Sequence, residues 1–277
     1  MLDVAIVGGG IFGQVVAAHL HQSGRSVVLI DDARPGAGSP PAGCVVRPSW
    51  LMGKMSKVEI ERCLGLLDGL YGLREVKFKL SPAPGSVTCH RVETNMILAG
   101  KTHYGKVEKI GSNFVTWDVG DPSLVASTDA RHVVVATGIW AQELCPWAPK
   151  VQPRWGWSFR GPPVAEPRIH LWAPYRQVVS FNMDDGRSWM GDGSALVKPT
   201  EVHRAKAEQR CRAHTALDMP GVPTFDVNSG ARPVIPGLAR PAYLEQGPDG
   251  VWCLTGGGKN GLAAAAWAAM ELERRLR

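Results

Sequence analysis

The chain has 277 residues, 44% of them hydrophobic, and a net charge of +6, so it can form a sizeable core and one large or two modest domains. The positive excess suits an anionic ligand but does not choose between a phosphorylated cofactor, an acidic substrate and nucleic acid. The longest unbroken apolar run, residues 262–270, is too short to span a bilayer, and we find no secretory signal, so we expect a cytoplasmic protein without a membrane segment. The six cysteines form no C-x-x-C pair, which argues against a metal site and against a disulfide framework.

The first part of the chain predicts a β-α-β unit followed by a loop and a second helix. The strand, helix and strand of the unit cover residues 3–7, 11–22 and 26–30. A stretch rich in Pro, Gly and Ser, residues 35–43, predicts a loop. Ser56 and Glu59 form a capping-box pattern that opens the second helix.

The remainder of the chain predicts more strands than helices. Alternation and turn signals indicate a hairpin over residues 106–124, a buried parallel strand over 132–138 and an antiparallel sheet within 146–192. A charged helix is expected over residues 201–217. A loop, a short apolar strand and a terminal helix complete the chain.

A glycine-rich turn lies between the first predicted strand and helix. Gly8, Gly10 and Gly13 fit the pattern G-x-G-x-x-G, in which the glycines allow a tight turn, close backbone approach to a diphosphate and tight helix–strand packing. The free N–H groups and the positive dipole end of the helix would bind the phosphates. The second strand ends at Asp31, whose carboxylate can accept both ribose hydroxyls of an adenosine and would repel the 2′-phosphate of NADP. This context predicts a dinucleotide site rather than a turn that serves packing alone.

A second glycine-rich turn, LTGGGKNGL at residues 254–262, opens the predicted terminal helix. A helix start that returns to the cofactor can stabilise the negative charge that a flavin gains at its N1–C2=O edge on reduction, whereas a nicotinamide gains no such charge. The strand VVVATG, residues 133–138, is of a kind that recurs in two-domain flavoproteins. The two turns therefore favour FAD over NAD, with the phosphates at the first turn and the ring at the second.

Several stretches, in order along nearly the whole chain, resemble the D-amino-acid oxidase superfamily, and most of all its glycine oxidases. They are VAIVGGGIFG, VVLID, GSPPAGCVVRP, ATGIWAQEL, SGARPVIPG and TGGGKNGL. The resemblance implies an α/β fold, with a Rossmann-like FAD-binding domain and a second, smaller domain that contains an antiparallel sheet. We expect a discontinuous FAD-binding domain of residues 1–50, 85–150 and 225–277, and a substrate domain of residues 51–84 and 151–224.

The resemblance also implies a set of site residues. For the cofactor they are Gly8, Gly10, Gly13 and Asp31 at the ADP half; Ser39, Ala42, Gly43 and Cys44 along the middle and ring of the flavin; Thr137, Gly138 and Trp140, which would close the site; Gly256, Gly257, Gly258, Lys259, Asn260, Gly261 and Leu262 at the pyrimidine edge; and, in addition, Ile11, Phe12, Asp32, Val107 and Arg232. Arg232, in the Gly-x-Arg-Pro position, and Lys259 would be the catalytic residues. The planar fork of Arg232 would bind the substrate carboxylate, and the alternative for this arginine is a surface salt bridge.

The chain departs from the family pattern at its C-terminal turn. Gly257 and Gly258 replace a bulkier His-x pair, which would widen the space beside the ring, and Lys259 replaces the usual arginine. The chain is also shorter than is usual, and the missing length falls in the substrate domain.

The family reaction is the oxidation of a C–N bond. A neutral amine loses hydride from its α-carbon to flavin N5, the imine hydrolyses, and dioxygen is reduced to hydrogen peroxide. The resemblance therefore implies an FAD-dependent oxidase of an amine or amino acid.

Residues 147–176 interleave tryptophans with lysines and arginines, which suits the stacking of bases and the binding of phosphates. The same pattern is typical of tryptophans that pack a half-buried sheet while arginines solvate its outer side. The first interpretation adds an alternative, namely the same C–N oxidation on an amino-acid-modified nucleobase in DNA, as in phage hypermodification. A further alternative is a flavin-bearing subunit of a hetero-oligomer.

Overall fold

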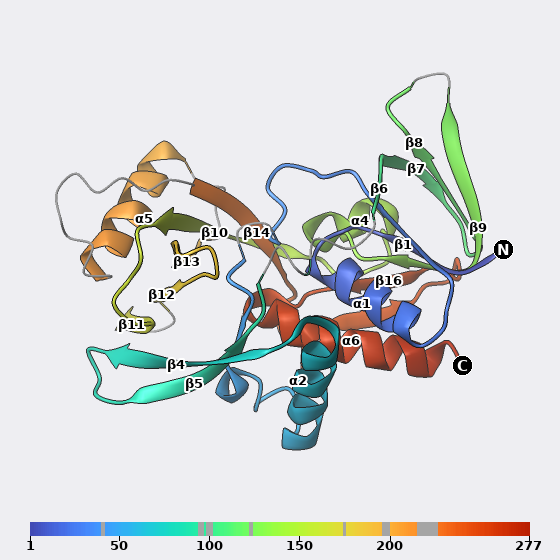
Figure 1. The fold of residues 1–277 in the computed structure, drawn as a ribbon. Coiled ribbons are helices and arrows are strands. Elements are labelled where there is room, and N and C mark those ends of the chain that lie inside the picture. The colour runs from blue at the N-terminus through green and yellow to red at the C-terminus, as the bar shows by residue number, and fades with distance from the viewer. Residues whose placement is uncertain are drawn as a thin grey trace.

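Two β-sheets carry the architecture of the computed structural model, which describes residues 1–39, 42–93, 97, 102–121, 124–173, 176–195, 200–214 and 227–277 (Figure 1). The strands of the first sheet are β1 (Leu2–Val7), β2 (Val27–Asp31), β6 (His103–Tyr104), β7 (Lys106–Ile110), β8 (Phe114–Asp118), β9 (Val125–Val135), β15 (Tyr243–Gln246) and β16 (Trp252–Thr255). Those of the second sheet are β3 (Val45–Val46), β4 (Arg74–Ser81), β5 (Ser86–Arg91), β10 (Gln152–Gly161), β11 (Arg168–Ala173), β12 (Arg176–Asn182), β13 (Ser188–Ala195) and β14 (Val227–Val234).

The helices lie around and between these sheets. The α-helices are α1 (Ile11–Gln22), α2 (Lys57–Tyr71), α4 (Ala141–Leu144), α5 (Glu201–His214) and α6 (Gly261–Arg275), and the 3-10 helices are η1 (Pro48–Trp50), η2 (Gly138–Trp140) and η3 (Gly258–Asn260). None of the helices in the described part of the chain is both long and apolar enough to cross a membrane. The helix expected over residues 201–217 is described as far as His214, and residues 215–217 lie outside the described ranges.

Four parallel strands, in the order β16-β9-β1-β2, form the centre of the first sheet. Val4 and Ile6 of β1 pack into the core on one face of this sheet, whereas Ala5 and Val7 pack into the core on the other face. Because both faces are buried, the strand is a nearly continuous apolar run. The parallel strands end at one edge, where the turns into α1, η2 and η3 begin.

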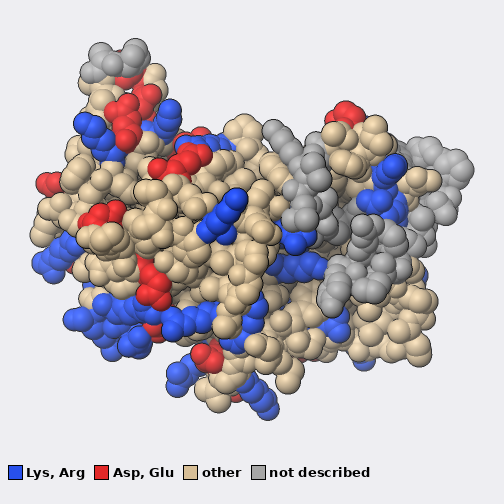
Figure 2. Space-filling model, turned by 180° about the vertical axis from the view of Figure 1, so that it is seen from behind, with Lys and Arg blue, Asp and Glu red and all other residues tan. Residues whose placement is uncertain are grey.

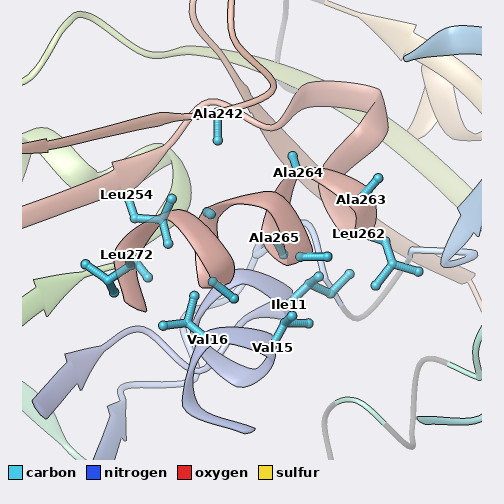
Figure 3. Packing of buried hydrophobic residues seen from close by; sticks show 14 of the residues in the cluster. Ile11, Val15, Val16, Ala242, Leu254, Leu262, Ala263, Ala264, Ala265 and Leu272 are labelled. Atoms are coloured by element: carbon cyan, nitrogen blue, oxygen red, sulfur yellow. The ribbon is translucent and has the colours of Figure 1, made fainter. Parts of the chain in front are cut away.

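Helices α1 and α6 pack against each other on one face of the first sheet. Figure 3 shows Ile11, Val15 and Val16 of α1 beside Leu262 and Ala265 of α6. The buried side of α6 consists mostly of alanines, namely Ala263, Ala264, Ala265, Ala266, Ala268 and Ala269. Because an alanine side chain ends at Cβ, the two helices can approach closely, with their N-termini near the same edge of the sheet.

The capping box predicted for the second helix is confirmed. The backbone N–H of Glu59 donates to Ser56 Oγ at 3.2 Å, and the backbone N–H of Ser56 donates to Glu59 Oε2 at 2.7 Å. Helix α2, which begins after this cap, packs its buried residues Ile60, Cys63 and Leu67 into the same core as α1 and α6.

The second sheet has the order β14-β10-β13-β12-β11-β4-β5-β3 and is antiparallel except between β11 and β4. One face contributes Phe159, Val178 and Met190 to a core that also contains Ala207 and Cys211 of α5. The other face carries a separate apolar cluster around Ile169 and Phe181. The fold is therefore an α/β fold with a Rossmann-like domain and an antiparallel second sheet, as the sequence predicts.

The expected domain boundaries stay a prediction. The second sheet contains strands from both of the expected domains. Strands β3 and β5 belong to the second sheet, whereas the sequence analysis places their residues in the FAD-binding domain. Helix α2 packs in the core of the first sheet, whereas residues 51–84 are expected in the substrate domain. Strand β14 also pairs in the second sheet, because its hydrogen-bonded neighbour is β10. Sheet pairing joins segments that are distant in sequence, which local patterns do not reveal.

Two glycine substitutions test the packing of α1 on β1. A Cβ at Gly13 would lie 1.8 Å from the carbonyl oxygen of Gly8, so we expect Gly13→Ala to lower the free energy of unfolding by about 1–3 kcal/mol. Exposed Gly65 lies inside α2, and a Cβ there meets no atom within 4 Å, so Gly65→Ala is expected to raise the free energy of unfolding by about 0.4–1 kcal/mol. Urea unfolding of both variants measures these changes, and equal stability of the two would contradict the assigned packing.

Candidate cofactor and substrate site

A cavity of about 470 Å³ lies at the edge where the parallel strands end. Its walls come from the turns after β1, β2, β9 and β16 and from residues of the second sheet. Turns at the carboxyl ends of parallel strands are the usual place for ligands in α/β folds. This position makes the cavity the candidate functional site.

The structure brings most of the predicted site residues to this cavity. Those that line it are Gly8, Gly10, Ile11, Phe12, Asp31, Asp32, Ser39, Ala42, Gly43, Cys44, Val107, Thr137, Gly138, Trp140, Arg232, Gly258, Lys259, Gly261 and Leu262. They come from both ends and from the middle of the chain. Their individual roles stay predictions.

Four of the predicted residues, Gly13, Gly256, Gly257 and Asn260, do not line the cavity. Gly13 lies under the first turn, and the Asn260 amide donates to the backbone oxygen of Trp50 at 3.3 Å. A Cβ at Gly257 would lie 2.5 Å from the ring of Phe12. The space expected to widen the cavity at this position is therefore filled by an aromatic ring from the first turn.

The start of α1 offers backbone donors to an anion. Gly8 has φ +109°, and a Cβ there would lie 2.6 Å from the carbonyl oxygen of Ala136, so only glycine fits this turn. Gly10 begins the helix without a side-chain cap, and the N–H of Ile11 donates to Ser39 Oγ at 2.8 Å. A bare helix N-terminus with a hydroxyl beside it suits a diphosphate.

Asp31 is held in place at the end of β2. Its Oδ1 accepts a hydrogen bond from the N–H of Gly9 at 2.9 Å, and its Oδ2 accepts one from the N–H of Ala33 at 3.2 Å. A carboxylate oxygen has more than one lone pair, so both oxygens can still accept bonds from a ligand. This geometry suits the ribose hydroxyls of an adenosine.

A group around Arg34 lies at the same end of the cavity, and the sequence analysis missed two of its members. The Arg34 guanidinium forms ion pairs with Asp32 and Glu143 and lies 5.5 Å from the ring centre of Trp140. All four residues line the cavity. The hydrogen bond to Glu143 raises the pKa of Arg34. No sequence signal identifies Arg34 and Glu143, because they are separated by 109 positions.

Thr137 and Thr255 lie at the turn after β9, and only the hydroxyl of Thr255 is hydrogen-bonded within the described part of the chain. Thr255 Oγ1 donates to the carbonyl oxygen of Gly138 at 2.8 Å, which ties β16 to η2. Thr137 Oγ1 is buried and has no hydrogen-bond partner within the described part of the chain. A buried hydroxyl without a partner costs free energy, so its place in the cavity wall suits a polar group of a bound cofactor.

The opposite end of the cavity is positively charged. Arg232 on β14 and Lys259 on η3 both line it, and an isolated β-bridge joins Val234 of β14 to Gly257, the residue before η3. Burial lowers the pKa of the Arg232 guanidinium. Burial also lowers the pKa of Lys259, and the positive charges of Arg232 and Arg154 lower it further. This end of the cavity suits an anionic group.

The second sheet supplies a cavity wall that the sequence analysis missed. It includes Ile169, Gln177, Val179, Trp189 and Gly191. The Trp189 ring stacks on Phe181 with centres 5.2 Å apart, and a Cβ at Gly43 would lie 3.0 Å from it. In a strand, successive side chains point to opposite faces of the sheet. This alternation does not reveal which face of the second sheet meets the cavity.

Three tryptophans of the basic and aromatic stretch, Trp147, Trp155 and Trp157, are half-buried against neighbouring parts of the chain. A Cβ at Gly247 would lie 2.1 Å from the Trp147 ring, one at Gly36 would lie 3.1 Å from the Trp155 ring, and Trp157 packs beside the core under α5. Figure 2 shows Lys and Arg in several groups on one face, with acidic side chains between them. The side chains of residues 172–176 lie outside the described part. These observations give no support to a nucleic-acid surface.

All six cysteines are buried free thiols. Within the described ranges, no group of three or more His, Cys, Asp or Glu residues is placed to hold a metal ion.

Comparison with known proteins places the chain in a family. A family model described as DAO: FAD dependent oxidoreductase matches residues 3–75 and 98–275. The chain belongs to this family. The resemblance to the D-amino-acid oxidase superfamily is therefore confirmed, and FAD is the cofactor of this FAD-dependent oxidoreductase. A search of the curated proteins finds no match.

Solved structures share the fold of this FAD-dependent oxidoreductase at low sequence identity. Iminodiacetate oxidase from Chelativorans sp. BNC1 matches with a TM-score of 0.71 and 16% identity, over 97% of this chain and 93% of its own. Glycine oxidase from Bacillus cereus ATCC 14579 matches with a TM-score of 0.64 and 14% identity, over 100% of this chain and 95% of its own. L-alpha-glycerophosphate oxidase from Mycoplasma pneumoniae, with FAD bound, matches with a TM-score of 0.74 and 14% identity, over 99% of this chain and 94% of its own.

The group around Arg34 is expected to stabilise bound FAD at its adenosine end. Arg34→Ala removes an ion-paired cation that lies over Trp140, so we expect the Kd for FAD to rise roughly 5- to 30-fold, which corresponds to about 1–2 kcal/mol. Quenching of flavin fluorescence on binding measures this Kd.

Two controls accompany this measurement. FMN lacks the adenosine, so Arg34→Ala should leave its Kd unchanged. Arg274→Ala removes an arginine that pairs with Glu271 on α6 and should leave the Kd for FAD unchanged. Equal weakening of FAD and FMN would show that Arg34 acts elsewhere.

Proposed function

We propose that this FAD-dependent oxidoreductase oxidises the C–N bond of an amine or amino acid that carries a carboxylate, and that dioxygen is the electron acceptor. The observation that carries the proposal is the position of Arg232, which reaches the cavity from the second sheet beside the turn of residues 258–262. A guanidinium at this position matches a carboxylate with two parallel hydrogen bonds.

In this proposal the side chains of the cavity bind and orient the substrate. When bound, FAD would accept a hydride from the α-carbon of the substrate. Arg232 would fix the carboxylate, so that the α-carbon has one orientation in the cavity. Lys259 lies at the start of the terminal helix, where its charge and the helix dipole would stabilise negative charge nearby. Trp189 and Val179 would exclude water from the apolar side.

The names of the structural relatives include amino compounds and a phosphorylated alcohol. Iminodiacetate oxidase and the glycine oxidases are named for amino compounds that carry carboxylates. The glycerophosphate oxidase is named for a phosphorylated alcohol. A test of the substrate class therefore compares carboxylated amines with glycerol 3-phosphate.

Arg232→Ala tests the proposed carboxylate anchor. The holoprotein is mixed without oxygen with glycine, sarcosine, D-amino acids or glycerol 3-phosphate, and the loss of the visible absorption of oxidised flavin is followed. We expect reduction by a carboxylated amine in the wild type. We expect roughly a 100-fold or larger loss in Arg232→Ala, because a bidentate charged pair contributes about 3 kcal/mol or more.

Two variants of Arg232 distinguish the loss of carboxylate binding from the loss of FAD. Arg232→Ala should remain yellow, since the phosphate and ribose sites are intact, and Arg232→Lys should regain part of the reduction rate because it keeps the charge. Unchanged reduction in Arg232→Ala would exclude Arg232 as the anchor. Reduction by glycerol 3-phosphate alone would exclude C–N oxidation.

The lowered pKa of Lys259 predicts a pH dependence of anion binding. Its ammonium loses its proton at a lower pH than an ordinary lysine, so affinity for propionate should fall by about 10-fold as pH rises through this lowered pKa. Propionate has no amine and stays ionised over this range, so its titration does not contribute. Calorimetric titration at several pH values gives the profile.

Two substitutions test whether Lys259 is the titrating group. Lys259→Arg keeps its charge, so the affinity for propionate should persist to higher pH. Lys259→Met should bind propionate weakly at every pH. A wild-type profile in Lys259→Arg would show that another group titrates.

A further inference from the structure

An exposed tyrosine, Tyr104, lies at the edge of the first sheet where the parallel strands end. Tyr104 is the last residue of the edge strand β6, it lines the cavity, and 67% of its surface is exposed. Among the aromatic side chains that the structure describes, only Tyr104 and Phe114 are exposed, and Phe114 on β8 does not line the cavity. Tyr104 therefore offers an open aromatic surface to a ligand in the cavity.

The backbone places Tyr104 directly beside Asp31. Strands β2 and β6 are parallel, with Asp31 paired to Tyr104, and the N–H of Gly105 donates to the backbone oxygen of Asp31 at 2.9 Å. Side chains of paired residues project from the same face of a sheet. The carboxylate of Asp31 and the ring of Tyr104 therefore start from neighbouring points on one face.

This face is the one that carries α1. The Asp31 carboxylate accepts a hydrogen bond from the N–H of Gly9, in the turn that leads into α1. Two residues before Tyr104, Thr102 Oγ1 accepts a hydrogen bond from the side chain of Gln14 on α1 at 2.9 Å. Tyr104 thus lies on the side of the first glycine turn, in the part of the cavity that suits the adenosine half of FAD.

The position of Asp31 limits where the base of an adenosine can lie. If the carboxylate binds the ribose hydroxyls, the base is attached to the carbon next to the one that carries the 2′-hydroxyl. The base then lies only a few atoms from Asp31, and Tyr104 is the residue paired with Asp31 on the adjacent strand. An aromatic side chain and a nucleobase both have flat apolar faces, so stacking removes both faces from water.

We propose that Tyr104 stacks on the adenine ring of bound FAD. The site then recognises the base by its face, in addition to the ribose at Asp31 and the diphosphate at the start of α1. This inference rests on the expected role of Asp31, because the ribose fixes where the base lies. It does not depend on which substrate the protein oxidises.

Three ligands separate the parts of the cofactor. FAD contains adenine and flavin, ADP contains adenine without flavin, and FMN contains flavin without adenine. For the full chain freed of flavin, we expect Tyr104→Ala to raise the Kd for FAD and for ADP at least about 5-fold, as the loss of one stacked base predicts. The Kd for FMN should stay unchanged. Fluorescence quenching measures the Kd of the flavins, and calorimetric titration measures that of ADP.

A measurement on the holoprotein complements these titrations. Dilution of the FAD-loaded protein releases flavin, and the recovery of flavin fluorescence gives the rate of release. Loss of the stack leaves FAD with fewer contacts, so Tyr104→Ala should release FAD faster than the wild type. Thermal unfolding of the flavin-free variants shows whether each is folded, and substitution of this exposed side chain should change their stability little.

Two further substitutions assign the effect to the aromatic ring. Tyr104→Phe keeps the ring and removes only the hydroxyl, so it should bind FAD and ADP as the wild type does. Phe114→Ala is the matched control, because it removes the other exposed ring, which does not line the cavity. It should change the Kd of none of the three ligands.

The outcomes separate this inference from the role of Asp31 on which it rests. An unchanged Kd for FAD and ADP in Tyr104→Ala, or an equal weakening of FMN, would refute the stack. An equal loss in Tyr104→Phe would refute it as well, since the hydroxyl and not the ring would then bind FAD. If Asp31→Ala leaves the Kd for ADP unchanged, the ribose is not bound at Asp31 and the placement of the base fails with it. The oxidation proposed at Arg232 stands in each of these cases.

Discussion

The close packing of α1 against α6 is the constraint on which the site depends. These helices come from opposite ends of the chain and lie side by side, as Figure 1 shows. The alanine surface of α6 lets it approach α1, and both helices follow parallel strands that end at one edge. Two helix N-termini thereby open on one cavity. An enlarged side chain within the contact would separate them and move apart the two glycine turns that line the cavity.

Sequence reasoning predicts the parts of this arrangement that depend on local patterns. The β-α-β unit, the cap at Ser56 and the two glycine turns each follow from residues that are neighbours in the chain. Glycine is also required at defined places, for example at Gly8, where a positive φ and a nearby carbonyl leave no room for a side chain. Such requirements leave a signal in the sequence itself.

The features that sequence reasoning missed depend on which distant segments meet. Arg34 and Glu143 make a direct ion pair, but neither has a neighbour in the chain that indicates it. Phe12 fills the space at Gly257 because α1 and η3 converge, which no local pattern predicts. The second-sheet wall of the cavity likewise depends on which face of that sheet meets the first. Which residues line or fill the cavity therefore depends on the tertiary structure and not on residue type alone.

The two sheets contribute different kinds of atoms to the cavity, and in the proposed function the first sheet would bind the cofactor while the second would select the substrate. The first sheet offers backbone N–H groups and a fixed carboxylate at strand ends, whose geometry follows from the fold itself. The second sheet offers side chains, such as Arg232 and Gln177, on strands that remain paired through their backbones whatever side chains they carry. Substitutions on its inner face can therefore change the charge and volume of the cavity while the strand-end geometry of the first sheet persists.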